Sequence, residues 1–139
     1  VWVTGRTEEK RALATSLGAH QAFESGARLP ERVDAVFETV GKATWSHSVK
    51  SLKPGGIIVV SGSTSGPDAH AELQRVFFLQ LRVAGSTMGT RDELTDLLAY
   101  LDLTGVRPQI GAELTFPEAQ KGFQAMLDGD TAGKIVFTH

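Results

Sequence analysis

The stretch that most constrains the fold is residues 33–66, VDAVFETVGKATWSHSVKSLKPGGIIVVSGSTSG. Two short apolar runs, 35–37 and 57–60, flank a helical pattern that Pro54-Gly55-Gly56 brings to an end. A strand, a helix and a second strand in this order predict a βαβ unit of a parallel sheet. Ligands of such sheets bind outside the carboxyl ends of the strands. The stretch therefore predicts the middle of a nucleotide-binding domain, with Trp45, Val49 and Leu52 of its helix buried.

The rest of the chain alternates in the same way. Strands are expected at 1–4, 20–23, 82–88, 110–116 and 134–138, and helices at 71–79, at 91–104, after Thr7 and after Pro117. The helix at 91–104 has a clear pattern, because Thr90 and Glu93 form a capping box and four leucines follow at helical spacing. Residues 128–130, Asp128 to Asp130, break the chain before the last strand. Strands that alternate with helices predict an α/β fold with a parallel sheet.

The composition is that of one globular domain: 139 residues with a formal net charge of −2. Because basic residues are not in excess, neither nucleic acid nor membrane is expected as a partner. The chain has no cysteine, which excludes disulfides and thiolate metal sites. No apolar run is long enough to cross a bilayer and no signal peptide is visible, so we expect a cytoplasmic protein.

The chain starts at Val1 and enters a strand-like segment at once. Natural chains usually start with Met and a few loose residues. One interpretation is a processed or renumbered chain. The other, which we favour, is a piece of a longer protein whose upstream part is missing.

The first candidate site follows the strand at 1–4, where Gly5, Arg6 and Thr7 form the turn and Lys10 follows in the next helix. In dinucleotide-binding folds an acidic residue at the end of the second strand holds the adenosine ribose, and an Arg there accommodates a 2′-phosphate instead. A carboxylate would repel that phosphate, whereas a small residue and a cation accept it. A solvated surface Arg is the alternative interpretation, but the strand–turn–helix context favours NADP(H) over NAD(H).

The second candidate is the pair of strand ends inside residues 33–66. Thr39, Val40 and Gly41 follow the first strand and residues 61–64 follow the second, and we expect them to offer hydroxyls and exposed backbone amides to a ligand. Such ends are small and polar in many α/β proteins, so a functional and a purely structural role are equally supported. The four histidines show no metal-ligand spacing, and no residue is predicted as catalytic or as a metal ligand.

The segment from Arg82 to Met88, RVAGSTM, is expected to be an edge strand. An uncovered edge invites pairing with other chains, and a symmetric dimer covers the edge by pairing it with its own copy. A homodimer through residues 82–88 is therefore expected, with an ordinary sixth strand whose edge is protected as the alternative.

The order of these pieces resembles the carboxyl-terminal portion of the medium-chain dehydrogenases/reductases, the superfamily of zinc-type alcohol dehydrogenases and quinone oxidoreductases. The matching segments are EEKRALATSLGA, VDAVFETVG, SLKPGGIIVVSGSTSG, FFLQLRVAGSTMGTRDEL and FPEAQKGFQAMLDGDTAGKIVFTH. LKPGG alone also occurs in methyltransferases, but their antiparallel last hairpin fits the strand–helix–strand tail of this chain poorly. The ordered set therefore favours the dehydrogenases.

The resemblance implies a partial Rossmann fold, a doubly wound parallel sheet that starts at the second strand of the order 3-2-1-4-5-6. Residues 1–108 would be the NAD(P)-binding domain without its first strand and Gly-rich phosphate loop. Residues 109–139 would complete a GroES-like catalytic domain, which holds zinc in some members of the family. Without the phosphate loop, the chain alone would bind NADPH poorly and would be inactive.

The resemblance also assigns residues to the cofactor. Gly5 would occupy the position of the family's ribose-binding acid. The other expected contacts are Arg6, Thr7 and Lys10 with the 2′-phosphate; Thr39, Val40 and Gly41 with adenosine and ribose; Val60, Ser61, Gly62, Ser86 and Met88 with the nicotinamide; and Lys134 with the pyrophosphate.

The activity that the resemblance implies is hydride transfer between NADP(H) and a small alcohol or carbonyl substrate, with zinc as the polarising group. A zinc-independent quinone oxidoreductase or enoyl reductase is the alternative. A non-catalytic nucleotide-binding or sensing protein is the alternative from a different class.

Overall fold

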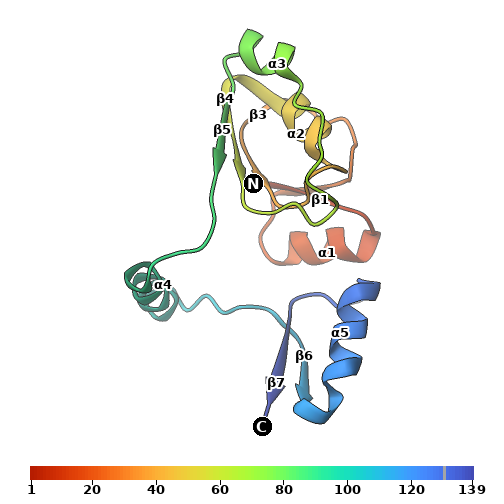
Figure 1. Ribbon diagram of the computed structural model, residues 1–139, viewed down its shortest axis with the longest axis vertical. Helices are drawn as coiled ribbons and strands as arrows, with labels where there is room; N and C mark the ends of the chain where they lie inside the picture. Colours follow the sequence, from red (N-terminus) through yellow and green to blue (C-terminus); the bar gives the residue numbers. More distant parts are fainter. Residues whose placement is uncertain (130) are drawn as a thin grey trace. The chain divides into compact units, whose positions relative to one another are not determined.

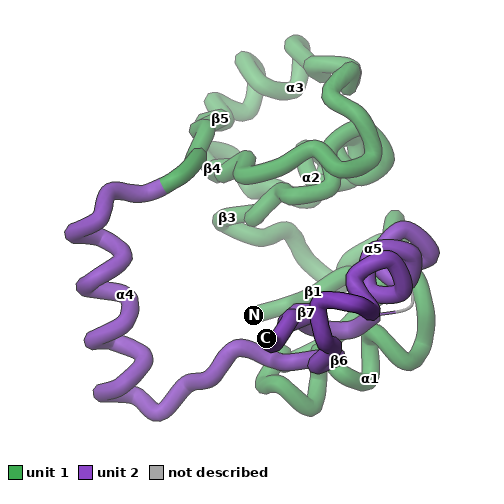
Figure 2. The backbone as a smooth tube through the Cα atoms, turned by 60° about the horizontal axis from the view of Figure 1, so that its bottom comes forward, with its two compact units in different colours: residues 1–88 green, residues 89–139 purple. Residues whose placement is uncertain are grey.

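The computed structural model describes residues 1–129 and 131–139, and it contains strands, helices and short connecting loops (Figure 1). The chain divides into two compact units, Val1–Met88 and Gly89–His139 (Figure 2). The division into domains at residue 108 stays a prediction.

The first unit begins with two parallel strands joined by a helix. Strand β1 (Trp2–Gly5) pairs with β2 (Gln21–Glu24), and α1 (Glu8–Ser16) connects them. Thr7 caps α1, since its Oγ1 accepts a hydrogen bond from the Lys10 amide at 3.3 Å. Two acidic residues in the first turn of α1 suit the positive end of the helix dipole.

A three-stranded parallel sheet follows, in the order β3-β4-β5. Strand β3 (Val33–Glu38) leads through α2 (Trp45–Ser51) to β4 (Leu52–Val60), and α3 (Leu73–Phe78) leads from β4 to β5 (Arg82–Gly85). All pairs in this sheet are parallel. The βαβ unit predicted for residues 33–66 and the α/β fold class are therefore confirmed.

The two sheets of the first unit do not pair with each other among the described residues. A cavity of about 740 Å³ is lined by residues 1–4 from β1 and its start and by residues 33–38 of β3, among others. In the strand order 3-2-1-4-5-6, the first strand lies between the strands that correspond to β1 and β3. The cavity thus lies between the two edges that a first strand would join.

The elements differ from the expected ones mainly at β4. This strand was expected at 57–60, but it already begins at Leu52, where Leu52 pairs with Val33. The pairing then shifts in register between Val33 and Ala35, because Pro54 has no amide hydrogen for the ladder and Gly55 turns with φ +77°. Strand β5 ends at Gly85, earlier than the expected 88.

A small apolar core holds the first unit together. Val49 and Leu52 are fully buried as expected, and Ile58 and Leu81 complete the buried cluster. Trp45 is only half-buried and packs against this cluster, so the expectation for Trp45 is met in part. Its indole Nε1 is nevertheless buried and has no hydrogen-bond partner among the described residues.

Replacing Trp45 with phenylalanine should leave the free energy of unfolding unchanged or raise it by about 1 kcal/mol, because a buried N–H without an acceptor costs about 1–3 kcal/mol. Thermal unfolding followed by far-UV circular dichroism would measure the effect, with Trp2→Phe as the matched substitution at the other tryptophan. A loss of more than about 1 kcal/mol in Trp45→Phe would show that packing outweighs the unsatisfied donor.

The second unit contains the expected helix and a last βαβ unit. Helix α4 (Arg91–Thr104) has the expected bounds and a complete capping box, with Glu93 N to Thr90 Oγ1 at 3.1 Å and Thr90 N to Glu93 Oε2 at 2.7 Å. Strand β6 (Ile110–Thr115) pairs in parallel with β7 (Lys134–Thr138). Between them lie a short 3₁₀ helix, η1 (Phe116–Glu118), and α5 (Ala119–Asp128).

Pro117 opens the helical segment as expected, and Gly122 of α5 lies so close to β6 and β7 that a Cβ would stand 2.8 Å from the ring of Phe137. Asp130, expected in the break before the last strand, lies outside the described residues. Among the described residues, no helix has the length and apolar character needed to span a membrane.

Candidate cofactor site

The carboxyl ends of β3 and β4 form one continuous rim, as expected from residues 33–66. The Ser65 amide donates to the Val40 carbonyl at 2.7 Å, and the Lys42 amide donates to the Gly66 carbonyl at 3.0 Å. The Ser65 hydroxyl links the same two loops, because it donates to the Val40 carbonyl at 2.6 Å and accepts from the Ala43 amide at 2.9 Å. The rim is therefore held by backbone contacts between loops that are 25 residues apart in sequence.

Two glycines permit this close approach. Gly41 is buried and has φ +85°, and a Cβ there would stand 2.7 Å from the Gly66 carbonyl oxygen and 2.9 Å from the Ser63 Cα. A Cβ at Gly62 would stand 2.9 Å from the Thr39 carbonyl oxygen. Because these neighbours are backbone atoms, a side chain at either position would push the two loops apart.

The buried carboxylate of Glu38 holds the loop that follows β3 through hydrogen bonds. Glu38 is the last residue of β3 and is 2 % exposed. Its Oε1 accepts from the amides of Val40 and Gly41 at 2.8 and 3.0 Å and from the Thr44 hydroxyl at 2.8 Å. Its Oε2 accepts from the Ser48 hydroxyl at 2.5 Å. Glu38 thus joins the end of β3 to the start of α2.

The hydrogen bonds decide the ionisation of Glu38. Burial raises the pKa of the carboxyl, while the hydroxyl of Ser48, the amide of Gly41, the hydroxyl of Thr44 and the amide of Val40 lower it, and the pKa lies below its ordinary value. The group is therefore a carboxylate at neutral pH. All four of these donors are neutral groups, so the charge of Glu38 is stabilised by hydrogen bonds.

Sequence reasoning did not single out Glu38. The available signal was an acidic residue at the end of an apolar strand followed by Thr-Val-Gly, with hydroxyl residues at positions 44 and 48. A carboxylate that ends a strand has the backbone amides of the next loop within reach.

The expectation that both strand ends offer free backbone amides is wrong for Val40 and Gly41. Both amides donate to Glu38 and are not available to a ligand. The Ser61 amide likewise donates to the Glu38 carbonyl at 2.9 Å. Thr39, Ser61, Ser63 and Thr64 are exposed residues of the rim, so the rim offers hydroxyls to a ligand.

The end of β5 continues the rim. The Ser86 amide donates to the Val60 carbonyl at 2.9 Å, which places Ser86 beside the end of β4. Met88 is 97 % exposed and has φ +58°, in the left-handed region. A bulky residue in that region is strained, and such strain clusters at binding and catalytic sites.

The expected residues at the end of β1 lie together on the turn and the start of α1. Arg6 is exposed and makes no hydrogen bond or ion pair with the described residues, while Thr7 serves as the helix cap. A second arginine, which sequence reasoning missed, also reaches this turn. The Nη1 of Arg11 donates to the Gly5 carbonyl at 2.9 Å, and its Nη2 forms an ion pair with Glu8 at 2.7 Å.

Lys134 is the first residue of β7 and belongs to the second unit, so its assignment to the pyrophosphate stays a prediction. Its backbone amide donates to the Gln109 carbonyl at 2.8 Å. The described residues contain no group of three or more His, Cys, Asp or Glu side chains that could hold a metal ion.

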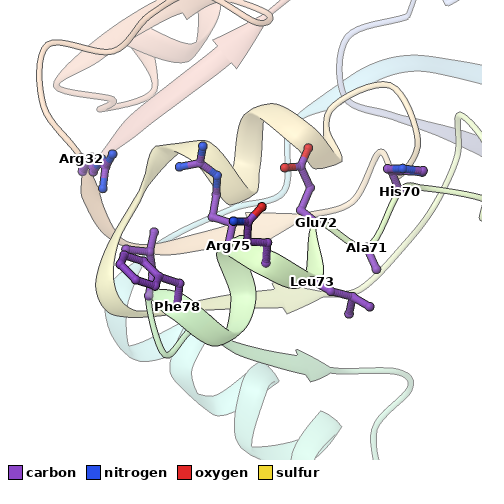
Figure 3. A pocket seen from close by; sticks show the side chains of 9 residues that line it. Arg32, His70, Ala71, Glu72, Leu73, Arg75 and Phe78 are labelled. Atoms are coloured by element: carbon purple, nitrogen blue, oxygen red, sulfur yellow. The ribbon is translucent and has the colours of Figure 1, made fainter.

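A larger hollow of about 980 Å³ lies beside α3 and contains none of the residues expected to bind the cofactor (Figure 3). It is lined by Arg32, by residues 70–75 and by Phe78 and Leu79. Glu72 has φ +54°, and its carboxylate accepts from the Ser46 hydroxyl at 2.7 Å, which lowers the pKa of Glu72. Because none of its lining residues belongs to the rim of strand ends, the hollow is separate from that rim.

Comparison with known proteins places the chain in a family. Residues 1–102 match the family described as zinc-binding dehydrogenase. Among curated proteins, the acryloyl-coenzyme A reductase of Metallosphaera sedula is 27 % identical over 109 residues, which are 78 % of this chain and 33 % of that protein. The chain therefore spans about a third of the length of this relative.

Two solved structures show how general the fold is. An NAD-dependent alcohol dehydrogenase superposes with a TM-score of 0.89 at 24 % identity, covering 100 % of this chain and 43 % of that chain. A crotonyl-CoA carboxylase/reductase in complex with NADP superposes with a TM-score of 0.88 at 18 % identity, covering 98 % and 42 %. One is named for NAD and the other holds NADP, so the likeness in fold does not decide between the cofactors.

The resemblance to the medium-chain dehydrogenases/reductases and the Rossmann-like fold class are confirmed, and the methyltransferase alternative is excluded. The parallel pairing of β6 with β7 agrees with this, because a methyltransferase would have an antiparallel last hairpin. Since the match covers residues 1–102 of the 139, the chain belongs to the zinc-binding dehydrogenase family.

Proposed function

We propose that the chain is part of a longer NADP(H)-dependent oxidoreductase that transfers a hydride between the nicotinamide and a small alcohol, carbonyl or activated alkene. The single observation that carries the choice of cofactor is the end of β1. Gly5 stands there in place of a ribose-binding acid, Arg6 lies on the turn, and Arg11 reaches the turn from α1. A 2′-phosphate is a dianion for which such a turn provides charge-assisted hydrogen bonds.

The residues of the rim fit the remainder of a dinucleotide. Ligands of parallel α/β sheets bind outside the carboxyl ends of the strands, which is where Thr39, Ser61, Gly62 and Ser86 lie. We propose that the Thr39 and Ser61 hydroxyls bind the ribose and nicotinamide portions and that the strained Met88 packs against the nicotinamide. The nicotinamide supplies the hydride when it is bound.

The proposed first strand, with its phosphate loop, would occupy the cavity between β1 and β3. The cavity exposes the unpaired backbone edges of two parallel strands, and Phe37 of β3 is 82 % exposed. A parallel strand inserted there would satisfy both edges and join the two sheets. The phosphates would then be bound by a loop that this chain does not contain.

The polarising group and the oligomer follow from the same proposal. A zinc site, where the enzyme has one, would need ligands from outside the described residues, which contain no group of three or more side chains that could hold a metal. A homodimer through residues 82–88 is supported by the free edge of β5, which pairs only with β4 among the described residues, and by Val83, which is 51 % exposed.

The test is turnover by the full-length protein. We expect the protein to oxidise NADPH with at least one member of a panel of aldehydes, quinones and enoyl thioesters. The reaction would be measured as the loss of the near-ultraviolet absorbance of NADPH. Retained activity after dialysis against a zinc chelator would assign the protein to the zinc-independent branch. Tight NADPH binding without turnover of any substrate would instead identify a non-catalytic nucleotide-binding protein and would refute the proposed oxidoreductase activity.

A further inference from the structure

The side chain of Arg11 folds back from α1 onto the end of β1. Its Nη1 donates to the Gly5 carbonyl at 2.9 Å, a contact that spans six residues. Only 20 % of the side chain is exposed, although Arg11 lies on a short surface helix. The side chain is therefore packed against the protein and its guanidinium is held at the turn by the Gly5 carbonyl, so that it does not extend into solvent.

Arg11 also crowds the position of Gly5. A Cβ built on Gly5 would stand 3.1 Å from the Arg11 Cγ and 3.6 Å from the Arg11 amide nitrogen. The φ of Gly5 does not lie in the left-handed region, so backbone strain does not require glycine there. The stem of Arg11 therefore crowds position 5, where a ribose-binding Asp or Glu would stand, and any side chain there would require Arg11 to shift.

We propose that Arg11 is a determinant of the preference for NADP(H) over NAD(H), acting with Arg6 at the 2′-phosphate. This inference rests on the proposed function. Arg11 contributes in two ways: its guanidinium presents a cation to the phosphate, and its stem crowds position 5, where an acidic side chain would have to stand. Arginine suits this role because its planar fork can bind the Gly5 carbonyl and a phosphate oxygen at once.

Glu8 is the competitor of the phosphate for Arg11. The Nη2 of Arg11 contacts Glu8 Oε2 at 2.7 Å, and 81 % of the Glu8 side chain is exposed. An exposed ion pair of this kind contributes little to stability. A phosphate dianion can therefore displace the Glu8 carboxylate while the Nη1 contact with Gly5 persists.

The first experiment compares binding of adenosine 2′,5′-bisphosphate and of AMP to the full-length protein by calorimetry, since the two ligands differ only in the 2′-phosphate. Arg11→Ala should weaken binding of the bisphosphate roughly tenfold and leave AMP unchanged. Arg11→Lys should fall between the two, because an ammonium lacks the fork. Glu8→Gln should strengthen bisphosphate binding, and Arg28→Ala, on an exposed loop, should change neither ligand.

The second experiment tests the steric part with a double-mutant cycle on kcat/KM for NADPH and NADH. Gly5→Asp alone should lose activity with NADPH without gaining activity with NADH, because the stem of Arg11 would crowd the new carboxylate away from the ribose. The double variant Gly5→Asp/Arg11→Ala should gain kcat/KM for NADH, so that the effects of the two substitutions are strongly non-additive.

The outcomes separate the two proposals. If Arg11→Ala weakens the binding of AMP and of the bisphosphate equally, or weakens neither, Arg11 has no role in the preference. The inference is then overturned, while the proposal of an oxidoreductase is unaffected. Additive effects of the two substitutions would overturn the steric part. If the wild-type protein binds both ligands equally and uses only NADH, the choice of NADP(H) fails as well.

Discussion

Glu38→Ala is expected to lower the free energy of unfolding by about 3 kcal/mol or more, because the substitution leaves buried donors without an acceptor. The amides of Val40 and Gly41 and the hydroxyls of Thr44 and Ser48 all donate to this carboxylate, which is 2 % exposed. The midpoint of urea unfolding would measure the loss. For the NADPH oxidation proposed for the full-length protein, the same substitution should raise KM for NADPH, since the Thr39–Gly41 turn would no longer be held.

Glu38→Gln is the matched control, because an amide has the same shape and its oxygen can still accept from the two amides. We expect a smaller loss of about 1–2 kcal/mol, since the hydrogen bonds are no longer charge-assisted. An equal loss in the Gln and Ala variants would show that the charge, and not the hydrogen-bonded geometry, holds the turn.

The charge of Glu38 also gives a pH dependence with a definite sign. Its pKa in the folded protein lies below the ordinary value of 4.5. The stability that it contributes is therefore fully present above that value and is lost as the pH falls through the folded pKa. The difference in stability between the wild type and Glu38→Gln should shrink as the solution is acidified, and a difference that stays constant with pH would contradict this assignment.

Gly41→Ala is expected to have a comparably large effect. The positive φ of Gly41 costs an L-residue about 1 kcal/mol, and the Cβ would stand 2.7 Å from the Gly66 carbonyl oxygen. Relief of this overlap requires movement of backbone and adds about 1–3 kcal/mol. We expect a total loss of about 3 kcal/mol in urea unfolding, together with a raised KM in the NADPH oxidation proposed for the full-length protein.

Gly55→Ala separates the two causes. Gly55 has φ +77°, close to that of Gly41, but no atom lies within 4 Å of its Cβ position. Its substitution should therefore cost only the conformational term of about 1 kcal/mol. Equal losses at the two positions would show that the close approach of the loops contributes nothing.

The local elements were predictable because their causes are local. Helix α4 has the expected bounds, since the Thr90–Glu93 capping box acts over three residues and the leucine spacing over a few turns. Strand β7 also has the expected bounds, and Pro117 marked the start of the helical segment between β6 and β7. The expected end of β5 at residue 88 was wrong, because the chain leaves the sheet after Gly85 and Met88 adopts a positive φ.

The candidate site was predictable in its position but not in its contacts. The carboxyl ends of β3, β4 and β5 follow from the βαβ order, which brought Thr39, Ser61 and Ser86 to one rim. The expectation that Val40 and Gly41 present free amides failed because Glu38 turns back on its own loop. Arg11 was missed because, on sequence, it reads as an ordinary helix-surface residue next to Lys10.

The alternation of strands and helices, the parallel sheet and the family could all be predicted from sequence, because periodicity, caps and ordered motifs are properties of neighbouring residues. The contacts between distant segments required the three-dimensional structure. They are the hydrogen bond from Ser65 to Val40, the overlap that a side chain at position 41 would cause, and the cavity between β1 and β3. Those contacts depend on how loops up to 25 residues apart approach in space, and no local pattern encodes that distance.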